Sequence, residues 1–575
     1  MLAWVKKNVD KGMARSIFER HSCDPLAAYI LAGRGIVSDD AIPFYLSDDI
    51  SLLRDPLTLP DMQIAVKRII QAKAKNEKVL IFGDRDVDGI TATVMLFEYL
   101  QCLGIDVSWS IPTGDETYGL SIEAVEGFAA IGGNLIVTVD CGISSIKEIS
   151  RANELGLSVI VTDHHMPKKE LPDAAATVNP KLPHSTYPFH DICGCAVAYK
   201  LVAALQDKLC RNAYTDSIFK EAEYLQLAAL GTIADIVPLK DENRIIARKG
   251  LSAINKNPRK GIAELLLVMG LSGKPITAEE LAWLLCPAVN SAGRMGCPEK
   301  AVNLLLEGDA QKRFVLAKEI KSLNEKRRRL GAKTLPIAEE LAIQNLDRFS
   351  GKLFLAAGEE ISRGITGVIA NRLIEKHHIP AMVVHLNGNL AIGSIRSPGN
   401  YDIRLLLEPL DDLLLNYGGH EGVLGFSMAR SLWGQYLDRL EIEMESILPT
   451  AMPHEKPIEV DAELPPDFIA PGILNLVGLF EPYGAGNKPL LFASFGLKVL
   501  GASYLGRREP KHLKFILDAG KYKWPAILWN GKDKAGDGII AGDRVDLLYT
   551  FNHNWHGGIE RPQIIIIDIC KSAVN

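Results

Sequence analysis

Three apolar stretches in the first half of the chain run directly into short polar segments that carry aspartate or histidine. The stretches are residues 79–82, 135–139 and 157–162, and helical periodicity separates them. Continuous apolar runs of this length are typical of buried parallel strands. The polar segments that follow them are residues 83–89, 140–142 and 163–165. Because ligands bind at the carboxyl ends of the strands in an open parallel sheet, we expect these side chains to meet at one edge.

A fourth apolar stretch, residues 228–234, ends at Asp235. An aspartate in such a place can also cap a helix or a turn, and for any one of these acids taken alone that is the better interpretation. Four acidic strand ends within one α/β segment are nevertheless hard to ascribe to chance. We therefore interpret Asp235 as the end of a further strand at the same edge.

The residue types at this edge predict a metal centre. Five or more carboxylates and imidazoles in one place would repel each other unless cations lie between them. Carboxylates with few imidazoles and no thiolates favour Mg²⁺ or Mn²⁺ over Zn²⁺, and an imidazole ligand favours Mn²⁺. Carboxylates that bridge two ions suit a site that activates a water and stabilises the leaving oxygen of a phosphodiester.

Composition limits the remaining possibilities. With 575 residues, 47% of them hydrophobic, the chain should form about three or four domains with real cores. No apolar run is long enough for a transmembrane helix, and the N-terminus does not look like a secretory signal. Nine cysteines without paired C-x-x-C spacing fit reduced thiols in the cytoplasm. A net charge of −6 argues against wholesale coating of nucleic acid but leaves room for a local basic groove.

The segment Asp163-His164-His165, together with its companion motifs, resembles the DHH phosphoesterase superfamily. The ordered set of motifs along nearly the whole chain resembles one family within it, the RecJ single-strand-specific 5′→3′ DNA exonucleases. The matching segments are residues 34–36, 44–46, 83–89, 139–143, 192–201, 231–239, 287–295, 393–397, 418–420 and 481–487. The resemblance implies single-stranded DNA as substrate and two Mn²⁺ or Mg²⁺ ions as cofactors. It also suggests a helicase and a single-strand-binding protein as partners, and roles in DNA recombination and repair.

The resemblance assigns roles to individual residues. The metal ligands would be Asp84, Asp86, Asp140, His164 and Asp235, with Asp140 as the bridge between the two ions. Three further residues would complete the catalytic set. Asp88 would lie behind the ligands, Asp163 would orient an imidazole or cap the following turn, and His165 would contact the scissile phosphate or act as an acid. A structural role for His165 is an equally good alternative.

Further residues would bind the phosphates of the strand. The family's asparagine/arginine motif corresponds to Asn290 and Arg294, and a guanidinium binds phosphate bidentately. The pocket for the terminal 5′ phosphate would contain Ser394, Arg396 and Ser397. The segment Gly418-Gly419-His420 would bring backbone N–H groups and an imidazole against the substrate. Without the resemblance, these segments would be interpreted as a solvated arginine, a polar hairpin and a glycine turn.

The same pattern predicts the organisation of the chain. We expect a helical segment at 1–50, a doubly wound parallel-sheet DHH domain at 51–250, and a mixed region with a long connector helix at 251–345. A second α/β domain, the DHH-associated domain, should follow at 346–452, and an OB-fold β-barrel at 453–575. The basic run 326–329 within the connector is either a solvated face or a wall of the DNA channel, and the solvated face is the default interpretation. Phe515, Trp524, Trp529 and Trp555 are more typical of core than of base-stacking residues.

Three positions differ from the family pattern. No arginine stands in residues 113–116, no Trp-His pair lies near 361–362, and residues 422–424 replace the usual small pair. Because the metal motifs are intact, these differences predict altered recognition of the strand end. Three alternatives remain. A DHH phosphodiesterase of short oligonucleotides or cyclic dinucleotides, or a pyrophosphatase, would not need the β-rich tail. A non-catalytic DNA-binding replication scaffold would have lost metal ligands.

Overall fold

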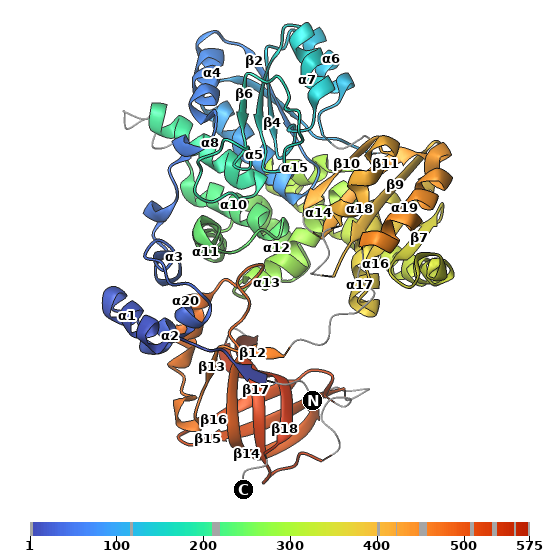
Figure 1. The fold of residues 1–575 in the computed structure, drawn as a ribbon. Coiled ribbons are helices and arrows are strands. Elements are labelled where there is room, and N and C mark those ends of the chain that lie inside the picture. Colours follow the sequence, from blue (N-terminus) through green and yellow to red (C-terminus); the bar gives the residue numbers. More distant parts are fainter. Residues whose placement is uncertain are drawn as a thin grey trace.

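The computed structural model describes residues 4–114, 119–209, 219–398, 403–420, 422–447, 457–505, 511–531, 538–556 and 559–572. Figure 1 shows a mostly helical body around one parallel sheet, a second α/β lobe beside it, and a β-barrel below both. No helix within the described ranges combines the length and the apolar character needed to cross a membrane.

The first sheet is parallel throughout, in the order β3-β2-β4-β5-β6, as the apolar runs predict. Its strands are β2 (Lys78–Gly83), β3 (Asp106–Ser110), β4 (Leu135–Val139), β5 (Ser158–Thr162) and β6 (Ala176–Val178). Alternate side chains of a strand enter different cores. Val79 and Ile81 face the core with α4 (Met62–Ala74), α5 (Val87–Cys102) and α8 (Gly194–Leu209). Leu80 and Phe82 face the core with α6 (Ile122–Ala130) and α7 (Ile146–Glu154). Burial on both faces explains why these strands are continuously apolar.

The segment before Asp235 is a helix, so its interpretation as a strand is wrong. Helix α10 (Glu221–Ala234) packs against α5, α8 and α11 (Asp241–Lys256), and all residues from Tyr224 to Ile233 are buried. A helix buried on every side loses the polar stripe that distinguishes it from a strand. Further helices continue the body: α12 (Lys260–Met269), α13 (Ala278–Glu280), the π-helical turn Leu281–Leu285, α14 (Cys286–Arg294) and α15 (Glu299–Leu306).

The connector predicted after residue 308 is present as α16 (Ala310–Asn345), 36 residues long, with Asp309 capping its first turn. It leads into a second sheet with the order β10-β11-β9-β8-β7, in which only β7 and β8 are parallel. This lobe contains β7 (Phe354–Gly358), α17 (Thr366–His377), β8 (Ala381–Asn387), β9 (Leu390–Arg396), α18 (Arg404–Leu407), β10 (Asn416–His420), β11 (Val423–Ala429) and α19 (Trp433–Ile447).

The C-terminal region forms the predicted barrel. After β12 (Ile458–Val460), β13 (Ala462–Glu463) and α20 (Ile473–Phe480), five strands close on themselves because β14 pairs with both β15 and β17. They are β14 (Phe492–Leu505), β15 (His512–Ala519), β16 (Tyr522–Leu528), β17 (Arg544–His556) and β18 (Ile559–Lys571). The sequence does not predict β16, because Pro525 lies inside it. Phe515 and Trp524 are buried, and the Trp524 indole donates to Ile469 O (2.7 Å), so they belong to the core.

The N-terminal segment packs on the barrel rather than on the first sheet. Strand β1 (Trp4–Lys6) pairs in parallel with β12. Residues of α1 (Lys11–His21), α2 (Pro25–Gly33) and α3 (Pro43–Leu46) share one core with the barrel strands and α20. Arg34 binds Asp461 through two hydrogen bonds of 3.0 and 2.6 Å.

Arg244 joins three parts of the chain. It lies in α11, is fully buried, and donates to the carbonyl oxygens of Phe44, Leu479, Phe480 and Glu481. Its guanidinium also lies over the ring of Tyr45, 4.5 Å from the centroid. One side chain thus satisfies backbone groups of the N-terminal segment and of the loop that leads into the barrel.

Replacing Arg244 should loosen this junction. Arg244→Ala leaves buried carbonyls without donors, so we expect a loss of about 3–5 kcal/mol of unfolding free energy. Urea denaturation measures the loss, and limited proteolysis should show earlier release of the barrel. Lys256→Ala, at the exposed end of the same helix, is the control and should stay within about 0.5 kcal/mol. Equal stability of the two variants would contradict this role.

Candidate metal centre and phosphate site

The first acidic motif follows β2 and opens α5. Asp84 is buried, and Asp86 caps α5 by accepting from the backbone N–H groups of Asp88 (3.0 Å) and Gly89 (3.1 Å). The amide oxygen of Asn290 accepts from Val87 N (2.9 Å), so this residue, predicted to lie near nucleic acid, lies against the backbone of the first motif.

Two other strand ends bring Asp140 and His164 beside the first motif. Asp140 follows β4 in the left-handed region (φ 59°), a conformation that aspartate tolerates better than most residues. Its Oδ1 lies 3.1 Å from His164 Nε2, and both residues are buried. Asp235, at the end of α10, places Oδ2 at 3.7 Å from the same nitrogen. The helix therefore delivers Asp235 to the place that the strand interpretation predicted.

Asp163 and Asp88 face the backbone. Asp163 accepts from the N–H groups of Ile143 (2.9 Å), His164 (2.7 Å) and His165 (3.0 Å), and from the His165 ring at Nδ1 (2.8 Å). Asp163 therefore both orients the imidazole and caps the turn. Asp88 accepts from Gly194 N (2.6 Å) and Cys195 N at the start of α8, and lies 3.8 Å from His164 Nε2. These contacts suit residues that hold the ligands in place.

The charges of this cluster are mutually repulsive in the protein alone. Burial, followed by the charge of Asp86, raises the pKa of Asp84 to about 7 and that of Asp88 to about 6. Burial and neighbouring carboxylates also raise the pKa values of Asp140 and Asp235 well above their ordinary range. Burial lowers the pKa of His165, but the charge and hydrogen bond of Asp163 outweigh it and raise this pKa to about 9.

A pair of divalent cations fits these donors. Ligand atoms lie within 4.8 Å of one another in three overlapping groups: Asp84–Asp86–Asp140, Asp140–His164–His165 and Asp88–His164–Asp235. The buried Oδ1 of Asp84 has no hydrogen-bond partner among the described residues. Cations at this position would supply the missing partner and remove the repulsion that raises the carboxylate pKa values.

Stabilisation by metal should therefore depend on pH. In the metal-free fold Asp84 and Asp88 hold protons that the unfolded chain releases near pH 4, so their contribution to stability falls as pH rises through about 6 and 7. A cation removes this penalty. We expect Mn²⁺ to raise the melting temperature more at pH 8 than at pH 5. Thermal unfolding with Mn²⁺ or with EDTA at each pH measures this, and an equal shift at both values would contradict it.

Two of the predicted phosphate residues, Arg294 and Arg396, lie where the helical body meets the second lobe. Arg294, at the end of α14, donates to Gly364 O (3.4 Å) just before α17. Arg396 ends β9 and donates to Ile395 O (2.9 Å). Gly367 of α17 makes room for it, because a Cβ there would lie 2.6 Å from Arg396 Nη2.

The remaining predicted phosphate residues lie on or directly after β9 and on β10, and β11 lies between these two strands in the sheet. The Ser394 hydroxyl lies 2.9 Å from the Thr366 hydroxyl. In the sheet, Ser394 of β9 pairs with Gly425 of β11, and Gly425 pairs in turn with Gly418 of β10. Ser397 has a buried hydroxyl without a hydrogen-bond partner among the described residues. Gly419 and His420 complete β10, while the His420 side chain lies outside the description.

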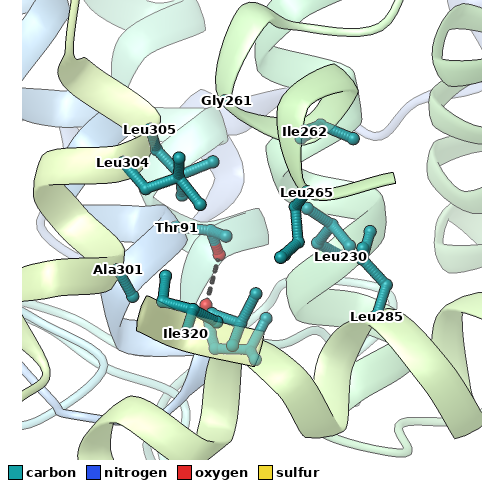
Figure 2. Close-up of a pocket in the computed structure, with 12 residues that line it drawn as sticks. Thr91, Leu230, Gly261, Ile262, Leu265, Leu285, Ala301, Leu304, Leu305 and Ile320 are labelled. Atoms are coloured by element: carbon teal, nitrogen blue, oxygen red, sulfur yellow. Dashed lines mark hydrogen bonds between the residues drawn. The ribbon is translucent and has the colours of Figure 1, made fainter. Parts of the chain in front are cut away.

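Sequence reasoning missed two residues after β6. Asn179 donates to His165 O (2.9 Å), and the charge of Lys181 reaches both Asp163 and Asp235. The sequence contained a signal for Asn179, because this residue directly follows the short apolar strand β6. A separate apolar pocket lies behind the first motif (Figure 2), where the Thr91 hydroxyl donates to Val87 O (2.7 Å). Its aliphatic lining makes it a packing space rather than a substrate site.

The fold and the sequence agree with known proteins. Residues 78–232 match the DHH family, N-terminal domain, and residues 460–568 match the RecJ OB domain. A parallel sheet with this acidic edge thus defines a phosphoesterase of the DHH class. The chain belongs to the RecJ family: it is 31% identical to the single-stranded-DNA-specific exonuclease RecJ of Bacillus subtilis over 99% of this chain and 71% of that protein. It is also 31% identical to RecJ of Escherichia coli, over 95% of this chain and 96% of that one.

Solved structures give the same result. The crystal structure of RecJ from Thermus thermophilus in complex with Mn²⁺ superposes with a TM-score of 0.78 at 28% identity, covering 100% of this chain and 80% of that one. The Mg²⁺ complex of the same protein gives 0.73 at 26% identity, covering 100% and 78%.

Proposed function

We propose that this chain is a metal-dependent exonuclease that hydrolyses single-stranded DNA from the 5′ end and releases 5′ mononucleotides. The observation that carries the proposal is the buried group of carboxylate and imidazole donors, in a chain related to RecJ over nearly its whole length. The named relatives are single-stranded-DNA-specific exonucleases, and T. thermophilus RecJ is known with Mn²⁺ and with Mg²⁺.

In this proposal, the residues that would hold the two ions are Asp84, Asp86, Asp140, His164 and Asp235, and Asp140 belongs to two of the three donor groups. Bound cations of this kind lower the pKa of water and neutralise charge on phosphate oxygens. The chain's own contribution is to hold the donors in fixed positions. Asp163 does so through its hydrogen bonds to the backbone and ring of the His165 turn, and Asp88 through its hydrogen bonds to the start of α8.

Cationic side chains would bind the substrate. His165, charged at neutral pH through its contact with Asp163, would contact the scissile phosphate. Arg294 would bind a phosphate bidentately. In our proposal, Ser394, Arg396, Ser397 and the β10 segment 418–420 bind the terminal 5′ phosphate, which would set the direction of cleavage.

The alternatives are less well supported. A phosphodiesterase limited to very short or cyclic substrates would leave the RecJ OB domain at 460–568 without a role. A non-catalytic scaffold would not need the complete donor set. We further propose the division at residues 50, 250, 345 and 452, a cytoplasmic location, and a helicase and a single-strand-binding protein as partners in recombination and repair.

The test is hydrolysis of end-labelled DNA with Mn²⁺ or Mg²⁺. Single-stranded, duplex, 5′-blocked and 3′-blocked substrates would be compared, with a length series of DNA and RNA. Mononucleotides released from single strands with a free 5′ end, but not from 5′-blocked strands, are the expected result. Cleavage of the shortest oligomers alone would favour the phosphodiesterase, and binding without cleavage would favour the scaffold. Comparing 5′-phosphate with 5′-hydroxyl strands tests the altered end recognition.

A further inference from the structure

One residue of the basic run on α16 differs from its neighbours. Lys326, Arg328 and Arg329 are exposed, as the default interpretation of a solvated face requires, whereas Arg327 is half-buried. Its Nε is buried and has no hydrogen-bond partner among the residues that the structure describes. Part of the Arg327 side chain is therefore buried without a hydrogen-bond partner among those residues.

Three positive charges act on Arg327, and they belong to Arg294 of α14, Arg328 of α16 and Arg372 of α17. Both α14 and α17 contact α16, so three helices contribute to one cationic cluster. Burial, followed by these charges, lowers the pKa of Arg327 to about 10, which leaves it charged at neutral pH. Arg327 is the partly buried member of this group, whereas Arg294, Arg328 and Arg372 are exposed. Like charges around a partly buried guanidinium favour the binding of an anion.

The cluster adjoins the site already described. The charge of Asp86 in the first motif acts to raise the pKa of Arg294. The charge of Arg294 in turn acts to lower the pKa of Arg396 of β9. The Ser291 hydroxyl donates to Ile320 O (3.4 Å) and so joins α14 to α16. Arg294 thus interacts electrostatically with both Asp86 of the first motif and Arg327 of α16.

We propose that Arg327, together with Arg294 and Arg372, binds a phosphate group of the bound strand. The inference rests on the proposed function, because it takes single-stranded DNA as the anion. Guanidinium groups suit phosphate oxygens through bidentate, charge-assisted hydrogen bonds. The phosphate is either the terminal 5′ group or an internal phosphodiester, and both have the chemistry that the cluster requires.

The experiment measures strand binding by fluorescence anisotropy in EDTA, over a series of KCl concentrations, with 5′-phosphorylated and 5′-hydroxyl single strands. We expect Arg327→Ala to weaken binding about tenfold or more and to reduce the salt slope by about one unit. Arg327→Lys should recover part of the affinity and part of the salt slope. Lys326→Ala, an exposed neighbour, is the matched control and should change little. Because Arg327 lies among like charges, its removal should not lower the melting temperature.

The outcomes distinguish the terminal 5′ phosphate from an internal phosphodiester, and they distinguish failure of this inference from failure of the proposed function. A loss confined to 5′-phosphorylated strands identifies the terminal phosphate, and a loss on both strands identifies an internal phosphodiester; either supports the proposal. Unchanged affinity and slope in Arg327→Ala, with normal binding by the wild type, overturns it. An equal loss in Lys326→Ala, or a lowered melting temperature that accounts for the loss, overturns it as well. A wild type that binds no single strand defeats the proposed function together with this inference.

Discussion

Asp140→Asn is expected to reduce DNA hydrolysis by a factor on the order of 10³ or more, equivalent to about 4 kcal/mol of transition-state stabilisation. The reason is that Asp140 belongs to two of the three donor groups, so its loss weakens both proposed metal positions. Steady-state release of mononucleotides measures the effect. Activity within about tenfold of the wild type would contradict the assignment.

The same substitution should stabilise the metal-free fold. Asp140 is buried and its pKa is raised well above the ordinary range, first by burial and then by Asp88 and Asp86. At neutral pH its charged form therefore destabilises the folded state, and a neutral amide of the same shape removes that cost. The melting temperature in EDTA should rise, and the extra stabilisation by Mn²⁺ should shrink. Activity and stability changing in opposite directions would separate a metal ligand from a structural residue.

Gly89→Ala should have the second largest effect on activity. A Cβ at Gly89 would lie 2.5 Å from Asp84 O and 2.6 Å from Asp84 N. Backbone atoms cannot yield as a flexible side chain does, so the first motif must move. We expect a loss of at least about 1–3 kcal/mol of unfolding free energy and a loss of activity on the order of 10²-fold, because Asp84 and Asp86 shift together.

The matched control for Gly89→Ala is Gly127→Ala. Gly127 lies in α6, and a Cβ there would meet nothing within 4 Å. Alanine has the higher helix propensity, so this variant should gain up to about 1 kcal/mol and keep full activity. Denaturation and hydrolysis assays on both variants measure the difference. Similar behaviour of the two would mean that the close approach at Gly89 is unimportant.

The acidic edge could be predicted because local sequence and long-range arrangement agree there. Buried parallel strands need continuous apolar runs, and their carboxyl ends must meet, so Asp84, Asp140 and His164 follow from pattern alone. The sequence predicts Asp235 in the right place but on the wrong element, since a helix buried on every side has the composition of a buried strand. The barrel is also predicted, except for strand β16, whose internal proline argues against a strand in the sequence.

The arrangement of side chains across elements could not be predicted in this way. Arg327 differs from its exposed neighbours only because α14 and α17 pack against one side of α16. Arg244 links segments about 200 residues apart through backbone carbonyls, which carry no sequence signal. The packing of the N-terminal helices on the barrel is likewise a consequence of tertiary contacts, not of any motif in either segment.

The most direct test of the account is the number of divalent cations that the protein binds. Mn²⁺ titration by calorimetry, with hydrolysis of a 5′-phosphorylated single strand measured on the same samples, would compare the wild type with Asp140→Asn. The account predicts two ions per wild-type chain, fewer ions in the variant, and hydrolysis that disappears with them. Unchanged Mn²⁺ binding and hydrolysis in Asp140→Asn would contradict it.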